Sequence, residues 1–152
     1  ANDMARTDEV MSAGFFLGIV YSAILAVLYI TFRFPLVEVF SPPEGDFSEI
    51  RDLSAFMMIG LSSYVIADAM IIITGGVLRG AGDTRWLMYA SVGLHWAMLI
   101  AQYYVILVWE FGPRVSWLTF CAMIFAIAIV YIWRLQNGVW RDPERLKLVM
   151  NE

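Results

Sequence analysis

The chain has 152 residues, of which 61% are hydrophobic and 16% are charged, whereas soluble proteins average roughly 45–50% and 25%. A chain of this length cannot bury so much apolar surface away from water, so its mean hydropathy of +0.70 indicates a membrane protein. The single cysteine excludes a disulfide scaffold, and the net charge of −4 argues against nucleic acid as a partner, because phosphate contacts need a basic surface.

Four stretches long enough to cross a bilayer follow one another along the chain. They cover about residues 10–32, 53–78, 86–109 and 115–133. About 20 apolar residues cross roughly 30 Å of hydrocarbon as an α-helix, and lipid offers the backbone no other hydrogen-bond partners. We therefore predict an all-α integral membrane protein that lies in the lipid bilayer and has four transmembrane helices within residues 10–133.

The first predicted span carries a stripe of small residues. They occur at every fourth position, as Gly14, Gly18, Ser22 and Ala26. Helices associate in lipid through close backbone contact, so this stripe is expected to face a neighbouring helix.

The distribution of basic residues predicts the orientation. An even number of spans puts both ends of the chain on one side, and that side carries seven of the ten Lys and Arg residues. The positive-inside rule therefore places residues 1–9 and 134–152 in the cytoplasm. The acidic loop 41–52 then faces outward, and the tail either lies along the membrane as an amphipathic helix or is solvated. Tryptophans at the span ends are expected at the interfaces: Trp86, Trp109, Trp117 and Trp133.

Asp68 is the only charged residue inside the predicted spans. A central Asp costs about 2.5–3.5 kcal/mol on insertion scales, which the surrounding Leu, Ile, Phe and Val residues offset. Arg79 lies about 16 Å away along the helix, too far for an ion pair. Asp68 must then hold a proton, bind a small cation or meet a partner elsewhere, and exchange between proton and cation is what an ion-coupled transporter requires. The alternative is that Asp68 bonds to a nearby hydroxyl or backbone group and only fixes the packing.

Other polar side chains in the spans are weaker candidates. Tyr64 lies one turn before Asp68, so its hydroxyl can share the same cavity, but a packing tyrosine would look the same. His95 is either a proton relay or a neutral side chain bonded to a neighbouring helix. Gln102 either lines a polar cavity or packs, and Cys121 is expected to be an inert filler in an apolar run. No enzyme signature and no cofactor are predicted.

The segment between the second and third spans predicts a tight hairpin. Arg79 ends a helix, where a cation suits the negative end of the helix dipole. Gly80 and Gly82 can adopt the left-handed conformation that turns the chain. Asp83 or Thr84 can then cap the next helix.

This turn resembles the GxLRGxGD turn that follows the tenth of the twelve helices in MATE (multidrug and toxic compound extrusion) transporters. The matching residues are Gly76-Val77-Leu78-Arg79-Gly80-Ala81-Gly82-Asp83-Thr84-Arg85. Tyr64 and Asp68 resemble the Tyr-x-x-x-Asp pattern of the NorM-like branch, at the same distance from the turn. The opening Ala1-Asn2-Asp3 is similar to the end of the glycine-rich loop after the family's eighth helix, so residues 1–9 are expected to be the cytoplasmic end of that loop. The resemblance therefore covers nearly the whole chain, as helices nine to twelve.

The resemblance implies the C-terminal part of a twelve-helix, two-lobed transporter, with the other helices in an N-terminal part of the same polypeptide. It implies secondary active efflux from a bacterial inner membrane, in which Na⁺ or H⁺ moving inward is exchanged for amphipathic, often cationic compounds. Asp68 would belong to the ion-coupling site in the C-terminal lobe, with Tyr64 close by. No fixed metal is implied beyond Na⁺ at Asp68.

The resemblance gives the turn a structural role only, carried by Arg79, Gly80, Gly82, Asp83 and Arg85. Two alternatives to the transporter stay open. One is a small four-helix multidrug exporter that dimerises around one membrane carboxylate. The other is a non-transporting membrane scaffold, in which Asp68 only contacts a partner helix.

Overall fold

The computed structural model describes residues 4–42 and 46–141, and every regular element in these ranges is a helix. The α-helices are α1 (Met4–Thr31), α2 (Arg33–Glu38), α3 (Ser48–Gly80), α4 (Thr84–Tyr103) and α5 (Pro113–Gln136). A π-helix, η1 (Tyr104–Val108), continues α4, and a 3-10 helix, η2 (Val139–Arg141), follows α5. Four of these units are long and apolar enough to cross a membrane: α1, α3, α4 with η1, and α5. The predicted all-α class with four membrane-length helices is confirmed.

The helices extend beyond the apolar stretches that predicted them. α1 begins at Met4, so most of the segment 1–9 that was expected to be loop is helical, and residues 1–3 lie outside the described ranges. α3 begins at Ser48, so the last part of the predicted outer loop 41–52 is helical too. Once a helix is nucleated, each added residue gains a backbone hydrogen bond, so a helix can continue into polar sequence. Apolar composition predicts only the part of the helix that lies in lipid. Neither α2 nor the π-helical end of the third span was predicted.

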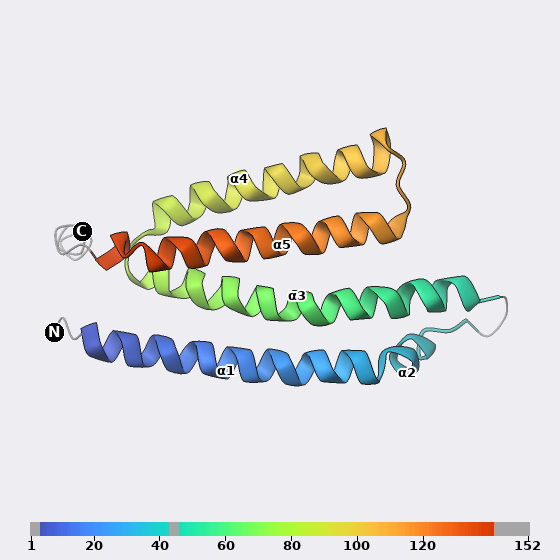
Figure 1. The fold of residues 1–152 in the computed structure, drawn as a ribbon, viewed down its shortest axis with the longest axis horizontal. Helices are drawn as coiled ribbons and strands as arrows, with labels where there is room; N and C mark the ends of the chain where they lie inside the picture. Colours follow the sequence, from blue (N-terminus) through green and yellow to red (C-terminus); the bar gives the residue numbers. More distant parts are fainter. Residues whose placement is uncertain (1–3, 43–45, 142–152) are drawn as a thin grey trace.

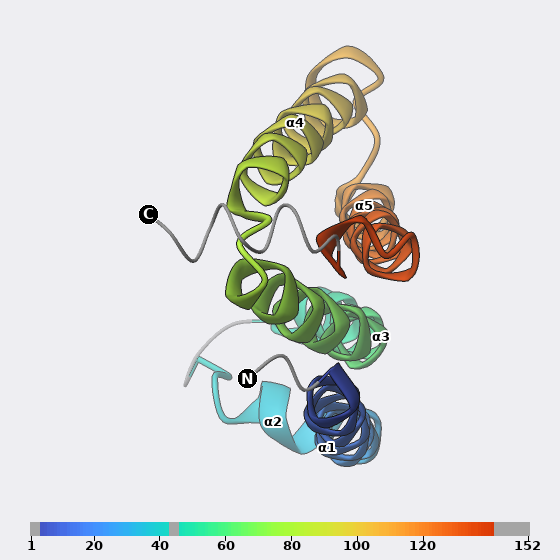
Figure 2. The same ribbon diagram turned by 90° about the vertical axis from the view of Figure 1, so that its left-hand side faces the viewer.

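The four long helices form one curved layer rather than a closed bundle, as Figure 1 and Figure 2 show. Their order across the layer is α1, α3, α5 and α4, so α3 lies between α1 and α5. The α3–α4 turn, the start of α1 and the end of α5 share one end, which we call the turn end. α2 and the α4–α5 connection lie at the opposite end, which we call the α2 end. Large apolar side chains on α1 and α4 stay exposed, as suits helices that meet lipid or other helices.

The small residues of α1 pack against α3, as predicted. A Cβ atom added at Gly18 would clash with the end of the Ile73 side chain, and one at Gly14 would lie 3.9 Å from Ile73 Cγ2. Ser22 is completely buried, and Ala26 is 9% exposed. The stripe lets the two backbones approach closely. Helices in lipid associate through such close packing, because lipid tails are as apolar as the side chains and the hydrophobic effect does not bring the helices together.

The main buried cluster joins α3, α4 and α5 near the turn end. Its members are Ala67, Leu78, Leu87, Ile124, Ile127, Ala128, Tyr131 and Trp140. Trp140 belongs to η2, and its indole N–H donates to the Leu135 carbonyl at 2.8 Å. Arg141 pairs with Asp8 of α1. The first part of the predicted tail therefore folds back onto the helices instead of leaving them, and residues 142–152 lie outside the described ranges.

Candidate functional site

Asp68 lies in the middle of α3 and is half-buried. Its carboxylate makes no hydrogen bond or ion pair with any residue that the structure describes, but it interacts electrostatically with the Tyr64 hydroxyl. Arg79 does not reach it: the Arg79 Nε donates to the Gly75 carbonyl of its own helix at 3.0 Å. An unpaired carboxylate at this depth can take up a proton or a small cation.

Tyr64 connects Asp68 to a stack of aromatic rings on α5. The Tyr64 ring stacks on Phe120, with centroids 5.9 Å apart and planes 29° apart. Phe120 in turn stacks on Trp117 at 5.5 Å and 17°. Packing on α5 thus fixes the Tyr64 ring and leaves its hydroxyl one turn from Asp68. We call Trp117, Phe120 and Tyr64 the aromatic stack.

Trp117 lies near the start of α5 with its indole turned inward onto α3, and its expected place at the membrane interface stays a prediction. A Cβ atom added at Gly60 would clash with the indole Nε1, which shows how closely the ring approaches the α3 backbone. A glycine at this position leaves room that any other residue would fill. The length of the apolar stretch could place Trp117 near a span end, but it could not reveal the glycine opposite.

The residues around Asp68 do not form a complete metal site by themselves. No group of three or more His, Cys, Asp or Glu residues comes together within residues 4–42 and 46–141. A sodium ion would need further oxygen ligands besides the Asp68 carboxylate and the Tyr64 hydroxyl, because hard cations take several oxygens. A proton needs the carboxylate alone.

The α3–α4 turn is a helix C-cap closed by Gly82. The Asp83 N–H donates to the Leu78 carbonyl at 2.9 Å, and the Gly82 N–H donates to the Arg79 carbonyl at 3.0 Å. These two bonds define a Schellman motif, and Gly82 takes the left-handed φ of 78° that the motif requires. The prediction of a left-handed residue was correct for Gly82 and wrong for Gly80, which is the last residue of α3. One left-handed residue is enough to reverse the chain.

Asp83 pairs with Arg134 of α5 instead of capping α4 with its side chain. It occupies the N-cap position of α4, but its side chain makes no capping hydrogen bond. Arg134 Nε lies 2.8 Å from Asp83 Oδ2, and the two side chains are 13% and 2% exposed. The Arg134 guanidinium also lies over the Trp86 ring, 5.0 Å from its centroid. This ion pair ties the turn to the end of α5, while Arg85 in the first turn of α4 is exposed.

The sequence of the chain matches a known protein family. The family model of MatE matches residues 1–108. The chain belongs to the MatE family. This confirms the resemblance to the MATE family, and with four membrane-length helices the chain is an integral membrane protein.

Two bacterial relatives illustrate the match to the MatE family. The chain is 21% identical over 146 residues to the "Probable multidrug resistance protein NorM" of Mannheimia succiniciproducens. It is 25% identical over 140 residues to the "Multidrug resistance protein MdtK" of Photorhabdus laumondii. The alignments cover 93% and 89% of this chain, and the chain spans 30% of the length of each relative. No solved structure matches the chain.

Gln102 and His95 do not share a site in this MatE chain. The Ser116 hydroxyl of α5 donates to Gln102 Oε1 at 2.8 Å, and the Gln102 Nε2 donates to the Ser116 carbonyl at 3.0 Å. Gln102 also lines a largely apolar cavity of about 370 Å³ between α3, α4, η1 and α5. His95 is exposed on α4, and its Nδ1 lies 2.7 Å from the Ser91 carbonyl of the same helix. The expected bond from His95 to a neighbouring helix is therefore replaced by one within α4.

Three side chains of α5 shape these sites and were not singled out from the sequence: Ser116, Phe120 and Arg134. Each contacts a residue on another helix, so no local pattern marks it. The three-residue spacing of Trp117 and Phe120 was the one available signal, because it puts both rings on one face of a helix. Cys121 is a buried free cysteine on the same helix, as expected for an apolar filler.

Proposed function

We propose that the chain supplies the ion-coupling helix of a secondary active multidrug efflux transporter. In this transporter Na⁺ or H⁺ moves inward while an amphipathic, often cationic compound moves out. The multidrug resistance names of two bacterial relatives support the transport of drugs, and family membership supports a transporter rather than an enzyme. The proposed location is the bacterial plasma membrane, with the turn end in the cytoplasm, which the excess of Lys and Arg at that end supports.

The unpaired carboxylate of Asp68 carries this proposal. A structural acid in a membrane helix is expected to have a fixed partner, because an isolated charge there is costly. Asp68 has no ion-pair or hydrogen-bond partner among the described residues, and it is only half-buried. A scaffold role would need a fixed partner for this carboxylate, and none lies among the described residues, whereas a site that alternately binds and releases a cation needs an exchangeable charge.

Ion binding at Asp68 can drive transport only if the ion prefers one conformation of the protein over another. In the proposed cycle the cation binds Asp68 in the outward-facing state and neutralises it. Neutralisation removes the cost of enclosing the charge and so favours a state in which α3 is covered. Release on the cytoplasmic side then restores the charge. Tyr64 assists by holding its hydroxyl beside the carboxylate.

Asp68→Asn in the intact protein tests the proposal. We expect efflux of a fluorescent cation from proteoliposomes to fall to background under both a Na⁺ gradient and a proton gradient, because the amide cannot exchange a cation. Glu9→Gln, which removes an exposed carboxylate on α1, is the matched control and should transport normally. The gradient that drives the parent protein identifies the coupling ion. Gradient-driven efflux that persists in Asp68→Asn would contradict the coupling role.

Tyr64→Phe separates the hydroxyl from the ring. The variant keeps the ring stacked on Phe120 but removes the only oxygen of the side chain. We expect a higher half-saturating concentration of the coupling ion with unchanged thermal unfolding. Tyr64→Leu, which also loses the ring contact, should lower the unfolding temperature in addition. An unchanged ion dependence in Tyr64→Phe would leave Tyr64 with a packing role only.

A further inference from the structure

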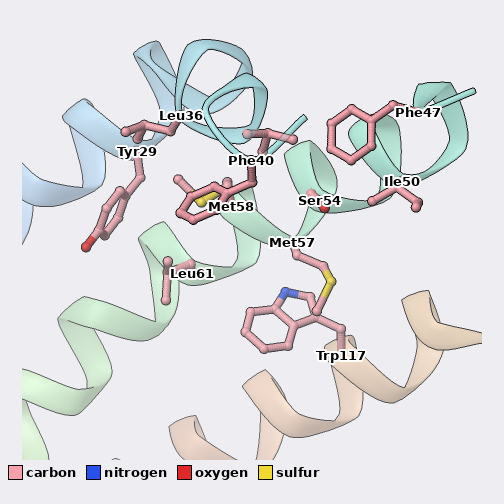
Figure 3. Close-up of a pocket in the computed structure, with 11 residues that line it drawn as sticks. Tyr29, Leu36, Phe40, Phe47, Ile50, Ser54, Met57, Met58, Leu61 and Trp117 are labelled. Atoms are coloured by element: carbon pink, nitrogen blue, oxygen red, sulfur yellow. The ribbon is translucent and has the colours of Figure 1, made fainter. Parts of the chain in front are cut away.

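Four exposed aromatic residues form a cluster where the third membrane-length helix ends. Each is 47–58% exposed, and the centroids of successive rings lie 5.8–5.9 Å apart. We call them the ring cluster: Tyr103, Tyr104, Trp109 and Phe111. The cluster lies at the α2 end of α4, the helix at the edge of the layer. Trp117 of α5, in contrast, is turned into the layer toward Met57 of α3, as Figure 3 shows. The ring cluster is therefore available to a partner outside the layer.

The π-helix η1 brings two of these rings together. At about 3.6 residues per turn, residues five apart in an α-helix point roughly 140° away from each other. The turn of η1 is wider, and the Trp109 N–H donates to the Tyr104 carbonyl at 2.9 Å. Tyr104 and Trp109 therefore lie on the same side of the helix, with their rings in contact. A continuous α-helix would separate the two rings, so η1 builds this surface.

Glu110 lies between two rings of the cluster in a conformation that disfavours a side chain. Its φ is 51°, and among the described residues it alone combines a side chain with a left-handed φ. Glycine adopts this conformation freely, whereas a Cβ atom makes it strained. The Glu110 carboxylate is exposed and has no ion pair within residues 4–42 and 46–141. A charged side chain kept at a position that suits glycine points to a use for its charge.

Arg114, in the first turn of α5, supplies the opposite charge close by in the chain. Its guanidinium lies over the Phe56 ring of α3, 5.6 Å from the centroid. Arg114 is exposed and, like Glu110, pairs with no acid in the part of the chain that the structure describes. Guanidinium groups match the geometry of phosphate oxygens. The ring cluster thus has an acid and a base beside it, and neither has a counter-ion in the described structure.

We propose that the ring cluster, Glu110 and Arg114 bind the headgroup of a zwitterionic phospholipid, with phosphatidylethanolamine as the example. Arg114 binds the phosphate, and Glu110 and the ring faces receive the ammonium, since aromatic faces attract cations. The rings lie where the headgroups meet the acyl chains, which Tyr and Trp favour because they join an apolar body to a polar group. The membrane-length unit of α4 and η1 ends at Val108, within the cluster, as this placement requires.

The charges at the α2 end favour a zwitterionic lipid over an anionic one. The described charged residues there are Arg33, Glu38, Asp46, Glu49, Arg51, Asp52, Glu110 and Arg114. Acids outnumber bases, so the local potential is negative and repels a lipid with a net negative charge. An apolar protein helix on the ring cluster would supply no charge for Glu110 or Arg114. A headgroup that carries both charges matches both residues.

Lipid retention by the delipidated intact protein, measured by native mass spectrometry, tests the proposal. The probes are phosphatidylethanolamine and phosphatidylglycerol with the same acyl chains, of which only the first carries an ammonium. We expect phosphatidylethanolamine to bind about 2- to 5-fold more tightly, the gain from one exposed cation–π contact. Equal or tighter binding of phosphatidylglycerol would overturn the proposal.

Two variants locate the site. Glu110→Gly removes the carboxylate and relieves the backbone, so we expect about 2- to 5-fold weaker binding of phosphatidylethanolamine with an equal or higher unfolding temperature. Weaker lipid binding in this variant is therefore not a sign of misfolding. Arg114→Gln removes the phosphate partner and should weaken the binding of both lipids. Glu49→Gln, which removes another exposed carboxylate at the α2 end, is the control and should bind as the parent does. Unchanged lipid binding in both Glu110→Gly and Arg114→Gln would overturn the proposal.

Fluorescence quenching by brominated phosphatidylethanolamine in vesicles tests the depth of the ring cluster. Trp109→Phe keeps a ring, so the difference between the parent and this variant gives the quenching of Trp109. We expect stronger quenching by bromines near the headgroup than by bromines near the chain ends. Trp140→Phe is the control, because Trp140 is 4% exposed and should add nothing to the quenching. Quenching of Trp109 mainly by deep bromines, or at neither depth because protein covers the rings, would contradict the proposal.

This inference does not rest on the proposed function, and the experiments keep the two apart. Lipid binding and quenching are measured without transport, so a failure of either leaves ion coupling untouched. Asp68→Asn should bind phosphatidylethanolamine as the parent does, because Asp68 lies in the middle of α3. Gradient-driven efflux that persists in Asp68→Asn would contradict ion coupling and leave the lipid site in place.

Discussion

Two aspartates fifteen residues apart in the sequence meet opposite environments in the structure. Asp83, at the turn end, is 4% exposed and lies 2.8 Å from a guanidinium nitrogen of Arg134. Asp68, in the middle of α3, is half-buried and has no hydrogen bond or ion pair with the described residues. The acid that is more deeply buried is thus the one with a fixed partner.

This difference distinguishes a structural acid from an exchangeable one. Removing one partner of a buried ion pair leaves an uncompensated charge, so Asp83 and Arg134 depend on each other. Asp68 has no such dependence within the described residues, and neutralising it should leave the fold intact. Four variants test this contrast.

Arg134→Met should have the largest effect. It removes the guanidinium that lies 2.8 Å from the buried Asp83 carboxylate, so we expect a loss of about 3–5 kcal/mol in the free energy of unfolding. Thermal unfolding of the intact protein in detergent measures the change. Adding Asp83→Asn to the same protein should recover part of the loss, because the buried charge is then gone as well. A double variant no more stable than Arg134→Met alone would show that the pair is not coupled.

Gly60→Ala should come next, because the α3–α5 contact near Asp68 depends on ring packing rather than on an ion pair. The added methyl group would overlap the Trp117 indole, which is rigid and must move. Overpacking of this kind costs about 1–3 kcal/mol. Gly93→Ala on α4, where no side chain or other helix lies within 4 Å, is the matched control and should be neutral or slightly stabilising. Equal effects of the two changes would mean that Trp117 does not rest on Gly60.

Ser116→Ala should have a smaller effect. It removes the hydroxyl that donates to Gln102 Oε1 and leaves in place the hydrogen bond that Gln102 Nε2 donates to the Ser116 carbonyl. The loss of one neutral hydrogen bond between helices should cost about 0.5–1.5 kcal/mol in thermal unfolding. Ser63→Ala, which removes a bond within α3 only, is the control. A loss as large as that of Arg134→Met would show that neutral bonds, not the ion pair, hold α4 and α5 together.

Asp68→Asn should have the smallest effect on stability and the largest on efflux. Because the carboxylate has no partner in the described structure, we expect the free energy of unfolding to change by no more than about 0.5 kcal/mol. Asp83→Asn, in contrast, should destabilise the protein clearly. The same thermal measurement on both variants sharpens the comparison of the two acids. A loss in Asp68→Asn that matched the loss in Asp83→Asn would make Asp68 a structural acid and leave the coupling proposal without support.

Some residues of the candidate site could be predicted from the sequence and others could not. Asp68 stands out because its neighbours along the chain are apolar, and its Tyr64 companion follows from helical spacing. The pairing of Asp83 with Arg134 was not predictable, because the two residues are 51 positions apart and either could have been solvated. The contact between Gly60 and Trp117 was not predictable for the same reason. The two residues are far apart in the sequence, and neither is distinctive without the other.

The sequence by itself determined the membrane environment, the four long helices, the glycine turn after the second of them and the family. These follow from composition and local spacing, which act within a few turns of the chain. The tertiary structure decided the order of the helices in the layer, the partner of Asp83, the choice of Gly82 as the left-handed residue and the aromatic stack beside Asp68. Apolar helices in lipid gain little from burial as such, so side-chain fit and polar pairing select which faces meet, and these depend on residues far apart in the sequence.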